Sequence, residues 1–478
     1  MARSIIPIRI LVLLLLTALV LEGCKLPVVG TPAATVKLPD TYNGNSDSTN
    51  SAISPVKLFY PSTALHQLID TVLQHNFDLQ IALQRIEMAR ASVIQSKAAL
   101  LPQVNAAGSP AIRRFGLYTM DGAGNIVTDI EKGKLVPKNL PDFYGGFQAS
   151  WEIDIWGKLK NRKKAALSRW LSTQAGRDFI LTGLVAETAG SYYALMAEDQ
   201  MLKVINEAIA LQEMALETVR VQKQTAQVNE LAVQQFEAQL LSWKAMRYDV
   251  LREIDRLENT IYSLAGKLPF PIKRDSGILT SSVIPTVRVG LPSALLRNRP
   301  DIREAELDVL ASHADLRAAR AAYLPNFTIT GGVGAQAYRT GLLFVFPEAL
   351  AYSLVGSLAG PVFNRNSIKA EFARSNAMQR EALLRYERLI TQGYLEVSLG
   401  LKNIEKLEEI YGLKEKESGF LRSSINVSAD LFRTGRASYL EVLIARQNAL
   451  RANMELIGAR KEQLLSVVGL YRALCGGR

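Results

Sequence analysis

Apolar residues recur along much of this chain in alternating steps of three and four positions. A mean spacing of about 3.5 residues is that of a coiled-coil seam rather than of an isolated helix. Residues 230–264 show it most clearly, residues 440–471 repeat it, and the stretch after Asn366 shows it again. Residues 158–224 contain no proline and complete a set of long predicted helices that pack in pairs. The clearest seam consists of Val233, Phe236, Leu240, Trp243, Arg247, Val250, Ile254, Leu257, Ile261 and Leu264.

Four shorter stretches alternate between two kinds of side chain at successive positions, which predicts β-strands. They are residues 103–115, 142–154, 326–338 and 352–362. In 142–154, Phe143 and Trp151 share a face of aromatic, apolar and small residues, and mostly polar residues occupy the other face. Strands of about ten to thirteen residues suit a tilted crossing of a bilayer. The alternative is the edge of a soluble β-sandwich.

Four strands cannot close a barrel by themselves. An open edge in lipid would leave backbone N–H and C=O groups unpaired, at a high cost in free energy. After the N-terminal leader, no apolar run reaches eighteen residues, so a membrane crossing would have to be made by strands. The membrane interpretation therefore requires several chains.

The chain carries an internal repeat. Residues 78–108 align without gaps on residues 301–331, and in both copies a Leu-Pro pair separates a helical pattern from a strand pattern. Each half then reads helix, strand, loop, strand, long helix, turn, helix. Helical pattern in the first half begins after Ser62, a candidate N-cap, and has a break near Asn76. The predicted segments are a first repeat at 62–266, an irregular connector at 267–296 that wraps the helices, a second repeat at 297–474 and a tail at 475–478.

The N-terminus is a predicted export signal. Arg3 and Arg9 precede twelve apolar residues at 10–21, and the segment ends in Leu-Glu-Gly-Cys24. This ending resembles a bacterial lipobox, in which the cysteine is lipidated, although Glu22 departs from the usual small residue. We therefore expect a signal peptide at 1–23, lipidation of Cys24 and an extended tether at 24–61. By the same resemblance, Lys25 favours sorting to the outer membrane.

The charge balance does not indicate nucleic acid. There are 56 Lys+Arg and 45 Asp+Glu, for a net charge of +11. Charges alternate in sign along the helices, as in 405–419, and no aromatic residues follow a basic stripe, so solvated helix faces account for most of the excess.

Enzymatic motifs are not found. His66, His75 and His313 lack the spacing of metal ligands, and the Gly-rich 331–334 lies in a strand pattern with no helix after it, which favours barrel packing over phosphate binding. We expect no catalytic set, metal or cofactor. Cys475 is interpreted as a lone thiol.

Taken together, the elements resemble the TolC-type outer-membrane efflux factors, most closely the OprM/NodT-like lipoprotein branch of efflux systems of the resistance-nodulation-division (RND) class. The resemblance covers nearly the whole chain. It depends on Cys24, the junction 291–306 (LPSALLRNRPDIREAE), both Leu-Pro breaks, 151–157 (WEIDIWG) and 433–443 (RTGRASYLEVL).

This resemblance implies a mainly α protein with a membrane β-barrel: a homotrimer with a long coiled-coil α-barrel in the periplasm and a twelve-stranded barrel built from four strands per chain. It also implies passive conduction of substrates in a tripartite system, outer-membrane lipid around the barrel, a periplasmic membrane-fusion adaptor and an inner-membrane RND-type pump. The alternative is a periplasmic coiled-coil adaptor or scaffold without a membrane barrel.

By the same resemblance, the two helix–turn–helix tips contact the adaptor and constrict the pore. Gly435 fits a tight turn at the second tip, and Glu441 and Phe432 are candidates for the pore constriction; an ordinary exposed glutamate is the alternative for Glu441. The first tip has Ala226 and Ala232 where a glycine and an acid are expected, so we expect its turn to be made differently, with Asn229 as the candidate, and gating to lie in the second half. The adaptor-contacting residues expected are Thr225, Ala226, Asn229, Leu231, Thr434, Gly435, Arg436, Ser438 and Leu440.

Three aromatic residues are candidates for girdles at the membrane interfaces, namely Phe143, Trp151 and Tyr338. Trp156 is a fourth, for which core packing is an equal alternative.

Overall fold

The computed structural model describes residues 27–30, 36–42, 59–60, 62–275, 277, 279, 288–360 and 366–474. The predicted signal peptide, Cys24, most of the tether, part of the connector and Cys475 lie outside these residues. The chain forms two compact units, each built from both halves of the sequence. The sheet unit takes in Met1–Ala33, Met88–Trp170 and Leu307–Leu383, and the hairpin unit takes in Ala34–Glu87, Leu171–Glu306 and Leu384–Arg478, as far as they are described.

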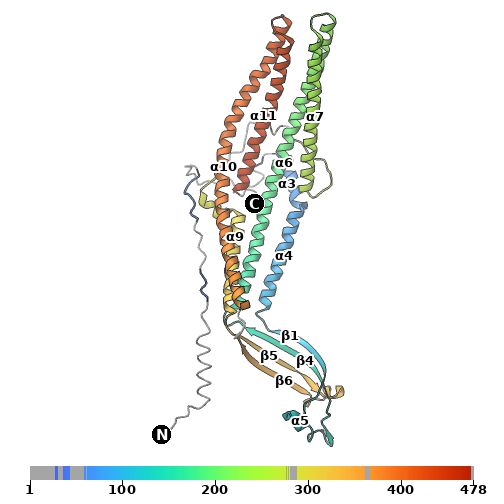
Figure 1. Ribbon diagram of the computed structural model, residues 1–478, viewed down its shortest axis with the longest axis vertical. Coiled ribbons are helices and arrows are strands. Elements are labelled where there is room, and N and C mark those ends of the chain that lie inside the picture. The colour runs from blue at the N-terminus through green and yellow to red at the C-terminus, as the bar shows by residue number, and fades with distance from the viewer. Residues whose placement is uncertain are drawn as a thin grey trace. The chain divides into compact units, whose positions relative to one another are not determined.

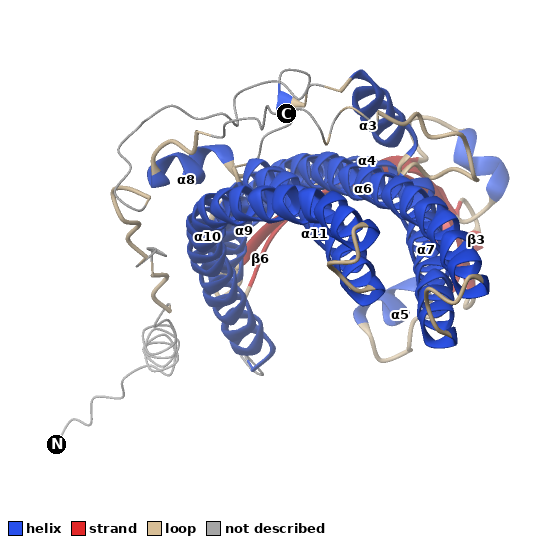
Figure 2. Cartoon of the chain, turned by 90° about the horizontal axis from the view of Figure 1, so that it is seen from above, coloured by secondary structure: helices blue, strands red, loops and turns tan. Residues whose placement is uncertain are grey.

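Long helices make up most of the chain, as the seam pattern predicts. Two antiparallel pairs dominate the hairpin unit: α6 (Lys158–Gln224) with α7 (Glu230–Leu264), and α10 (Asn366–Arg433) with α11 (Tyr439–Ala473) (Figure 1). Seen along their axes, the helices of this unit lie in a curved row rather than in a closed bundle (Figure 2). The other helices are α3 (Thr63–His75), α4 (Phe77–Ala98), α8 (Leu295–Asn298) and α9 (Pro300–Ala321), with a 3-10 turn, η2, at Pro292–Ala294. None of the helices in the described part of the chain is long and apolar enough to cross a membrane.

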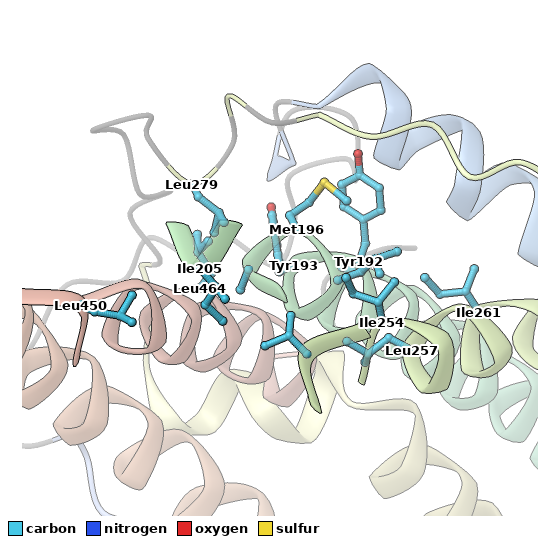
Figure 3. Close-up of a cluster of buried hydrophobic side chains, with 14 of the residues drawn as sticks. Tyr192, Tyr193, Met196, Ile205, Ile254, Leu257, Ile261, Leu279, Leu450 and Leu464 are labelled. Carbon is cyan, nitrogen blue, oxygen red and sulfur yellow. The ribbon is translucent and has the colours of Figure 1, made fainter. Parts of the chain in front are cut away.

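The core of the hairpin unit confirms the predicted seam. Val233, Phe236, Leu240 and Trp243 are buried, as are four of the later apolar stations of α7. Tyr192, Tyr193 and Met196 of α6 pack with Ile254, Leu257 and Ile261 of α7 in one cluster, which Leu450 and Leu464 of α11 join (Figure 3). Apolar burial along these seams is what holds the single row of helices together.

The predicted break in the first helix is confirmed. The Ser62 hydroxyl accepts from the Leu65 backbone N–H at 3.5 Å, and α3 ends at His75. The Asn76 side chain then caps both neighbouring helices, since its oxygen accepts from the Leu79 N–H (2.9 Å) and its nitrogen donates to the Leu264 carbonyl (2.9 Å). One polar residue thereby satisfies backbone groups at the start of α4 and the end of α7.

The connector lies against the helices where it is described. The Tyr192 hydroxyl donates to the Lys273 carbonyl at 3.2 Å, and the Arg274 guanidinium pairs with Asp199 of α6 (3.4 Å) and with Glu258 of α7. Burial raises the pKa of the Asp199 carboxyl, and Arg274 opposes that shift.

The sheet unit contains a four-stranded antiparallel sheet in the order β1-β4-β5-β6 (Figure 1). Its strands are β1 (Gln103–Arg113), β4 (Leu140–Ile153), β5 (Asn326–Ala337) and β6 (Leu350–Ala359), which confirms the four predicted segments to within three residues at each end. The two loops between these strands hold further short elements. The first holds a short helix, α5 (Met120–Asn125), and a hairpin of β2 (Asp129–Glu131) and β3 (Lys134–Leu135), and the second holds a 3-10 turn, η3 (Thr340–Phe344).

Two tryptophans of the 151–157 motif fasten the helix-to-strand breaks. The Trp151 indole N–H donates to the Leu100 carbonyl at 3.0 Å, beside the first Leu-Pro break. The Trp156 indole N–H donates to the Pro325 carbonyl at 2.7 Å, at the second break. For Trp156 the alternative of core packing is wrong, because the residue is 49% exposed. Both carbonyls lie between the end of a helix and the strand that follows it, where no ladder or helix donor reaches them, and the indoles supply the donors.

Candidate functional site: sheet faces and hairpin tips

One face of the four-stranded sheet is apolar and exposed on every strand. The register places Ala106, Phe147, Val333 and Tyr352 in one row across the sheet, and alternation along each strand fills the rest of the face with similar residues. Leu354 of β6 is 80% exposed and Ile112 of β1 is 77% exposed. An apolar surface that spans four strands is far larger than a soluble chain leaves in water, so it fits lipid.

The opposite face of the sheet is polar. Arg113 of β1 pairs with Asp142 of β4 at 2.8 Å, and the Gln336 amide of β5 donates to the same carboxylate at 2.8 and 3.1 Å. This network joins three strands at one end of the sheet, and Ser150, Thr328 and Ser353 continue the polar face along it. Alternation of polar and apolar faces is the pattern of a strand with water on one side and lipid on the other.

Glycines on the polar face leave room for the Tyr144 ring close to the strands. A Cβ on Gly334 would meet the Gly145 carbonyl oxygen at 2.5 Å and the Tyr144 ring at 3.0 Å, and one on Gly146 would meet the Tyr144 hydroxyl at 2.9 Å. The Gly-rich 331–334 lies in strand β5, as its pattern predicts, and at Gly334 the neighbouring strand leaves no room for a side chain.

The predicted aromatic residues lie at two levels of the sheet. Phe143 pairs with Ala337 near the end that carries the loops, and Tyr338 follows directly, with its hydroxyl bonded to Glu131 of β2. Trp151 lies eight residues further along β4, or roughly 26 Å at 3.3 Å per residue. Along a strand tilted by about 35–45° this separation spans roughly 19–22 Å of membrane depth, a little less than the apolar band of about 25 Å between two aromatic girdles.

The two hairpin tips have the same backbone structure. In the second tip, the Gly435 N–H donates to the Phe432 carbonyl (3.0 Å) and the Arg436 N–H to the Leu431 carbonyl (2.8 Å), with Gly435 at a φ of +70°. This pair of bonds is the Schellman motif, which closes the last turn of α10.

The expectation of a different first turn was wrong. The Ala226 N–H donates to the Lys223 carbonyl (3.0 Å) and the Gln227 N–H to the Gln222 carbonyl (2.9 Å), and Ala226 itself has a φ of +57°. The same motif therefore forms with alanine in the left-handed position. Asn229 does not make this turn but caps the next helix, since its side chain accepts from the Ala232 N–H at 3.1 Å. In each tip the residue six positions after the threonine is an exposed leucine, Leu231 and Leu440.

Glu441 is exposed in the first turn of α11. Its carboxylate accepts from the Ser438 hydroxyl at 3.4 Å, and Ser438 is the N-cap of the helix. A carboxylate at this position favours the helix through the macrodipole. Phe432, one turn before Gly435, is half-buried.

A buried arginine explains the junction motif at 291–306, and pattern analysis did not single it out. Arg299 is 5% exposed and bonds in a forked arrangement to Asp301 (3.1 and 2.7 Å), to Glu396 of α10 (2.7 Å) and to the Ala473 carbonyl at the end of α11 (3.0 Å). Gly393 of α10 leaves room for it, since a Cβ there would meet the arginine Nε at 3.2 Å. The Arg-Pro-Asp sequence at 299–301 was the available signal, because Pro300 opens α9 and Asp301 lies in its first turn.

No group of three or more histidine, cysteine or acidic side chains able to hold a metal ion exists within the described ranges. The sheet, with one apolar and one polar face, and the exposed tips of long paired helices define a membrane channel subunit as the class of protein.

Comparison with known proteins agrees with this class. The family model described as outer membrane efflux protein matches residues 68–267 and 291–476. The toluene efflux pump outer membrane protein TtgC of Pseudomonas putida is 29% identical over 475 residues, covering 97% of this chain and 95% of that protein. The cation efflux system protein CusC of Escherichia coli is 27% identical over 467 residues, covering 96% of this chain and 97% of that protein.

Solved structures share the fold. The outer-membrane channel OprN superposes with a TM-score of 0.81 at 24% identity, covering 94% of this chain and 98% of that one. The MtrE outer membrane channel of Neisseria gonorrhoeae, in its open state, also gives a TM-score of 0.81 at 24% identity, covering 95% of this chain and 98% of that one.

This chain belongs to the outer membrane efflux protein family. It is an outer-membrane channel of an efflux system, with a helical part in the periplasm, and it conducts rather than catalyses.

Proposed function

We propose that three copies of this chain form the exit duct of a tripartite efflux system. The observation that supports this most directly is the sheet: its lipid-compatible face requires a membrane, and β1 and β6 each have one edge with no partner strand among the described residues. If β1 of each chain pairs with β6 of the next, three chains close a twelve-stranded barrel and no backbone edge meets lipid.

The partners that fit are a periplasmic membrane-fusion adaptor and an inner-membrane RND-type pump. The tips of the two hairpins present exposed Thr225, Thr434, Arg436, Ser438 and Leu440 in two backbone frames of the same geometry. A repeated element with two similar docking surfaces per chain suits an adaptor that is itself a repeated helical assembly. The names of the relatives refer to toluene, antibiotics and cations, so we infer that the duct wall does not select the substrate.

Glu441 is the proposed gate residue of the second tip, and Phe432 of the same tip is the second candidate. Three symmetry-related carboxylates near the axis would favour cations and repel anions. Since Glu441 also supports the start of α11, substitution by Gln is the informative change: it removes the charge and keeps a side chain able to bond to Ser438. Loss of cation selectivity in both Glu441→Gln and Glu441→Ala channels supports a role of the Glu441 charge in the gate. A change in the Glu441→Ala channel alone would mean that Glu441 acts only by supporting the start of α11.

Cys24 is the proposed site of lipidation. A Cys24→Ser chain should take up no radiolabelled palmitate, while a Cys475→Ser control should be labelled as fully as the parent chain. Equal labelling of the Cys24→Ser chain would place the lipid elsewhere.

The channel itself is tested in detergent and in planar bilayers. We expect the protein to leave the membrane only with detergent, to have the mass of a trimer in native mass spectrometry, and to insert pores of uniform conductance. Release as a monomer by salt alone would instead indicate the periplasmic scaffold.

A further inference from the structure

Helix α6 begins with an unusual concentration of positive charge. Its first seven residues, Lys158-Leu-Lys-Asn-Arg-Lys-Lys164, hold five cations and no carboxylate. The N-terminus of a helix carries a partial positive charge, so cations there are unfavourable and acidic residues are preferred. Asp154, just before the helix, accepts from the Leu159 N–H (2.9 Å) and the Lys160 N–H (2.7 Å), so its carboxylate satisfies backbone donors rather than lysine side chains. Residues that go against the local helix preference in this way are expected at functional positions.

The start of α6 has two exposed faces, and one of them carries paired charges. Lys158 pairs with Glu152 at 2.5 Å, and Glu152 lies on the polar face of the sheet, where it is in register with Thr328. At roughly 100° per residue, Arg169 returns to within about 20° of the direction of Lys158. Arg169 is also paired, with Asp315 of α9. Two of the three cations on this helix face, Lys158 and Arg169, are therefore paired, and the third, Arg162, is exposed about 40° from Lys158.

The other exposed face carries lysines without ion pairs. Lys160, Lys163 and Lys164 point roughly 140° to 240° away from Lys158 around the helix. Lys160 and Lys164 are exposed, and within the described residues none of the three has a carboxylate in ion-pair range. One flank between the two faces is closed, since Leu159 and Ala166, about 100° and 80° from Lys158, are buried. The three lysines consequently lie on the side that continues the apolar, lipid-facing surface of the sheet.

The level of these lysines matches that of lipid headgroups. Strand β4 ends at Ile153, and the side chains of Trp151, Ile155 and Trp156 that surround this end are exposed, as expected for residues at a membrane interface. Lys160 and Lys164 are about 3 Å and 9 Å beyond Lys158 along the helix, at 1.5 Å per residue. The headgroup layer extends roughly 5 to 8 Å beyond the hydrocarbon on each side.

We propose that Lys160, Lys163 and Lys164 bind anionic phospholipid headgroups in the periplasmic leaflet of the outer membrane. Ammonium groups on flexible stems suit phosphodiester groups, whose positions vary from one lipid to the next. Bound phosphates at this helix end also offset the unfavourable field of the helix on its own lysines. The proposal rests on the proposed function only in requiring that the sheet spans the membrane.

The experiment counts lipids on the purified channel. Wild-type protein in mixed micelles of phosphatidylglycerol and phosphatidylcholine with the same acyl chains is examined by native mass spectrometry. We expect phosphatidylglycerol to be retained in preference, and the triple variant Lys160→Gln, Lys163→Gln, Lys164→Gln to lose that preference by up to about fivefold per lysine at low salt. The matched control, Lys402→Gln, Lys406→Gln, Lys416→Gln, makes the same change of charge at exposed positions of α10 and should behave as wild type.

Further readouts separate a lipid site from a damaged protein. The variant with arginine at all three positions keeps the charge and should keep the preference, and the glutamine variant should remain a conducting oligomer because removing cations from a helix N-terminus does not destabilise it. Equal retention of phosphatidylglycerol by the glutamine variant and wild type overturns the proposal. A wild-type protein that neither assembles nor conducts contradicts the proposed function instead.

Discussion

Ala226 and Gly435 hold the same backbone conformation at the two tips, but at different cost. Both have φ in the left-handed region, and the hydrogen bonds around them have the same pattern. In this region a Cβ crowds the neighbouring backbone, which costs alanine roughly 1 kcal/mol relative to glycine. The first tip therefore carries strain that the second does not.

Substitutions at these two positions should change the stability of the two tips in opposite directions. Ala226→Gly should stabilise the first tip by about 1 kcal/mol, and Gly435→Ala should destabilise the second by a similar amount. Hydrogen exchange of the backbone amides at 225–232 and 434–441 in the purified channel measures each tip separately. Faster exchange at the first tip of the Ala226→Gly protein would show that Ala226 is unstrained.

At the scale of elements, Arg299 joins three helices through one guanidinium. It bonds to Asp301 at the start of α9, to Glu396 of α10 and to the Ala473 carbonyl at the end of α11. Replacement of a buried ion-pair partner leaves the other charge uncompensated, which typically costs about 3 to 5 kcal/mol.

Arg299→Met should therefore lower the thermal unfolding temperature of the channel strongly, and a second change, Asp301→Asn, should recover part of the loss by removing the stranded charge. Arg303→Met is the matched control, because Arg303 pairs with Glu306 on the surface, where a pair contributes at most about 1 kcal/mol. An equal fall in unfolding temperature in Arg299→Met and Arg303→Met would contradict a special stabilising role for Arg299.

His313 of α9 makes the contact with α10 in the sheet unit sensitive to pH. The Gln379 amide donates to His313 Nδ1 at 2.7 Å, so the ring is neutral in this contact. Burial, with a smaller effect of the nearby Arg317, lowers the pKa of His313 below its usual 6.5. The unfolded chain therefore binds a proton more readily than the folded one, and stability falls as the pH falls through 6.5 towards the lowered pKa.

A His313→Gln protein should lose this part of the pH dependence. We expect wild type to unfold at a lower temperature at pH 5.5 than at pH 7.5, and the difference to be smaller in His313→Gln. His66→Gln, on α3, serves as the control. An unchanged pH dependence in the His313 variant would exclude the contact as its source.

For the whole molecule, the two faces of the sheet should respond oppositely to the same substitution. Leu354 lies on the apolar face and its neighbour Ser353 on the polar face of β6. A lysine on the lipid face near the middle of the bilayer costs roughly 2 to 4 kcal/mol, whereas one facing the lumen remains in water.

Leu354→Lys should therefore reduce the yield of heat-stable channel in the outer membrane, while Ser353→Lys should assemble normally and shift the pore towards anions. Gel mobility without heating and reversal potentials in a salt gradient measure the two effects. Normal assembly of the Leu354→Lys chain would contradict a lipid-facing surface.

Most of the elements were predictable because each follows from a local rule. Prolines after Leu101 and Leu324 end helices, strict alternation defines the strands, and Asn76 interrupts a helix by bonding to nearby backbone. The first tip was not predicted correctly. Its residue types favour another kind of turn. The packing of α6 against α7 nevertheless fixes where the chain must reverse, so Ala226 adopts the strained left-handed conformation.

The contacts of Trp151, Trp156 and Arg299 were equally hidden from pattern analysis. Each bonds to a carbonyl distant along the chain, and hydrophobic periodicity carries no information about such partners.

By itself the sequence determined the long paired helices, the four strands with one apolar face, the repeat and the family, because periodicity and proline position act over a few residues. Only the tertiary structure decided how the turns close, which carbonyls accept hydrogen bonds from the tryptophans and how Arg299 joins three helices. It also separated the lysines of α6 into paired and unpaired faces. These features depend on groups brought together from distant parts of the chain, where the free energy of packing outweighs local preference.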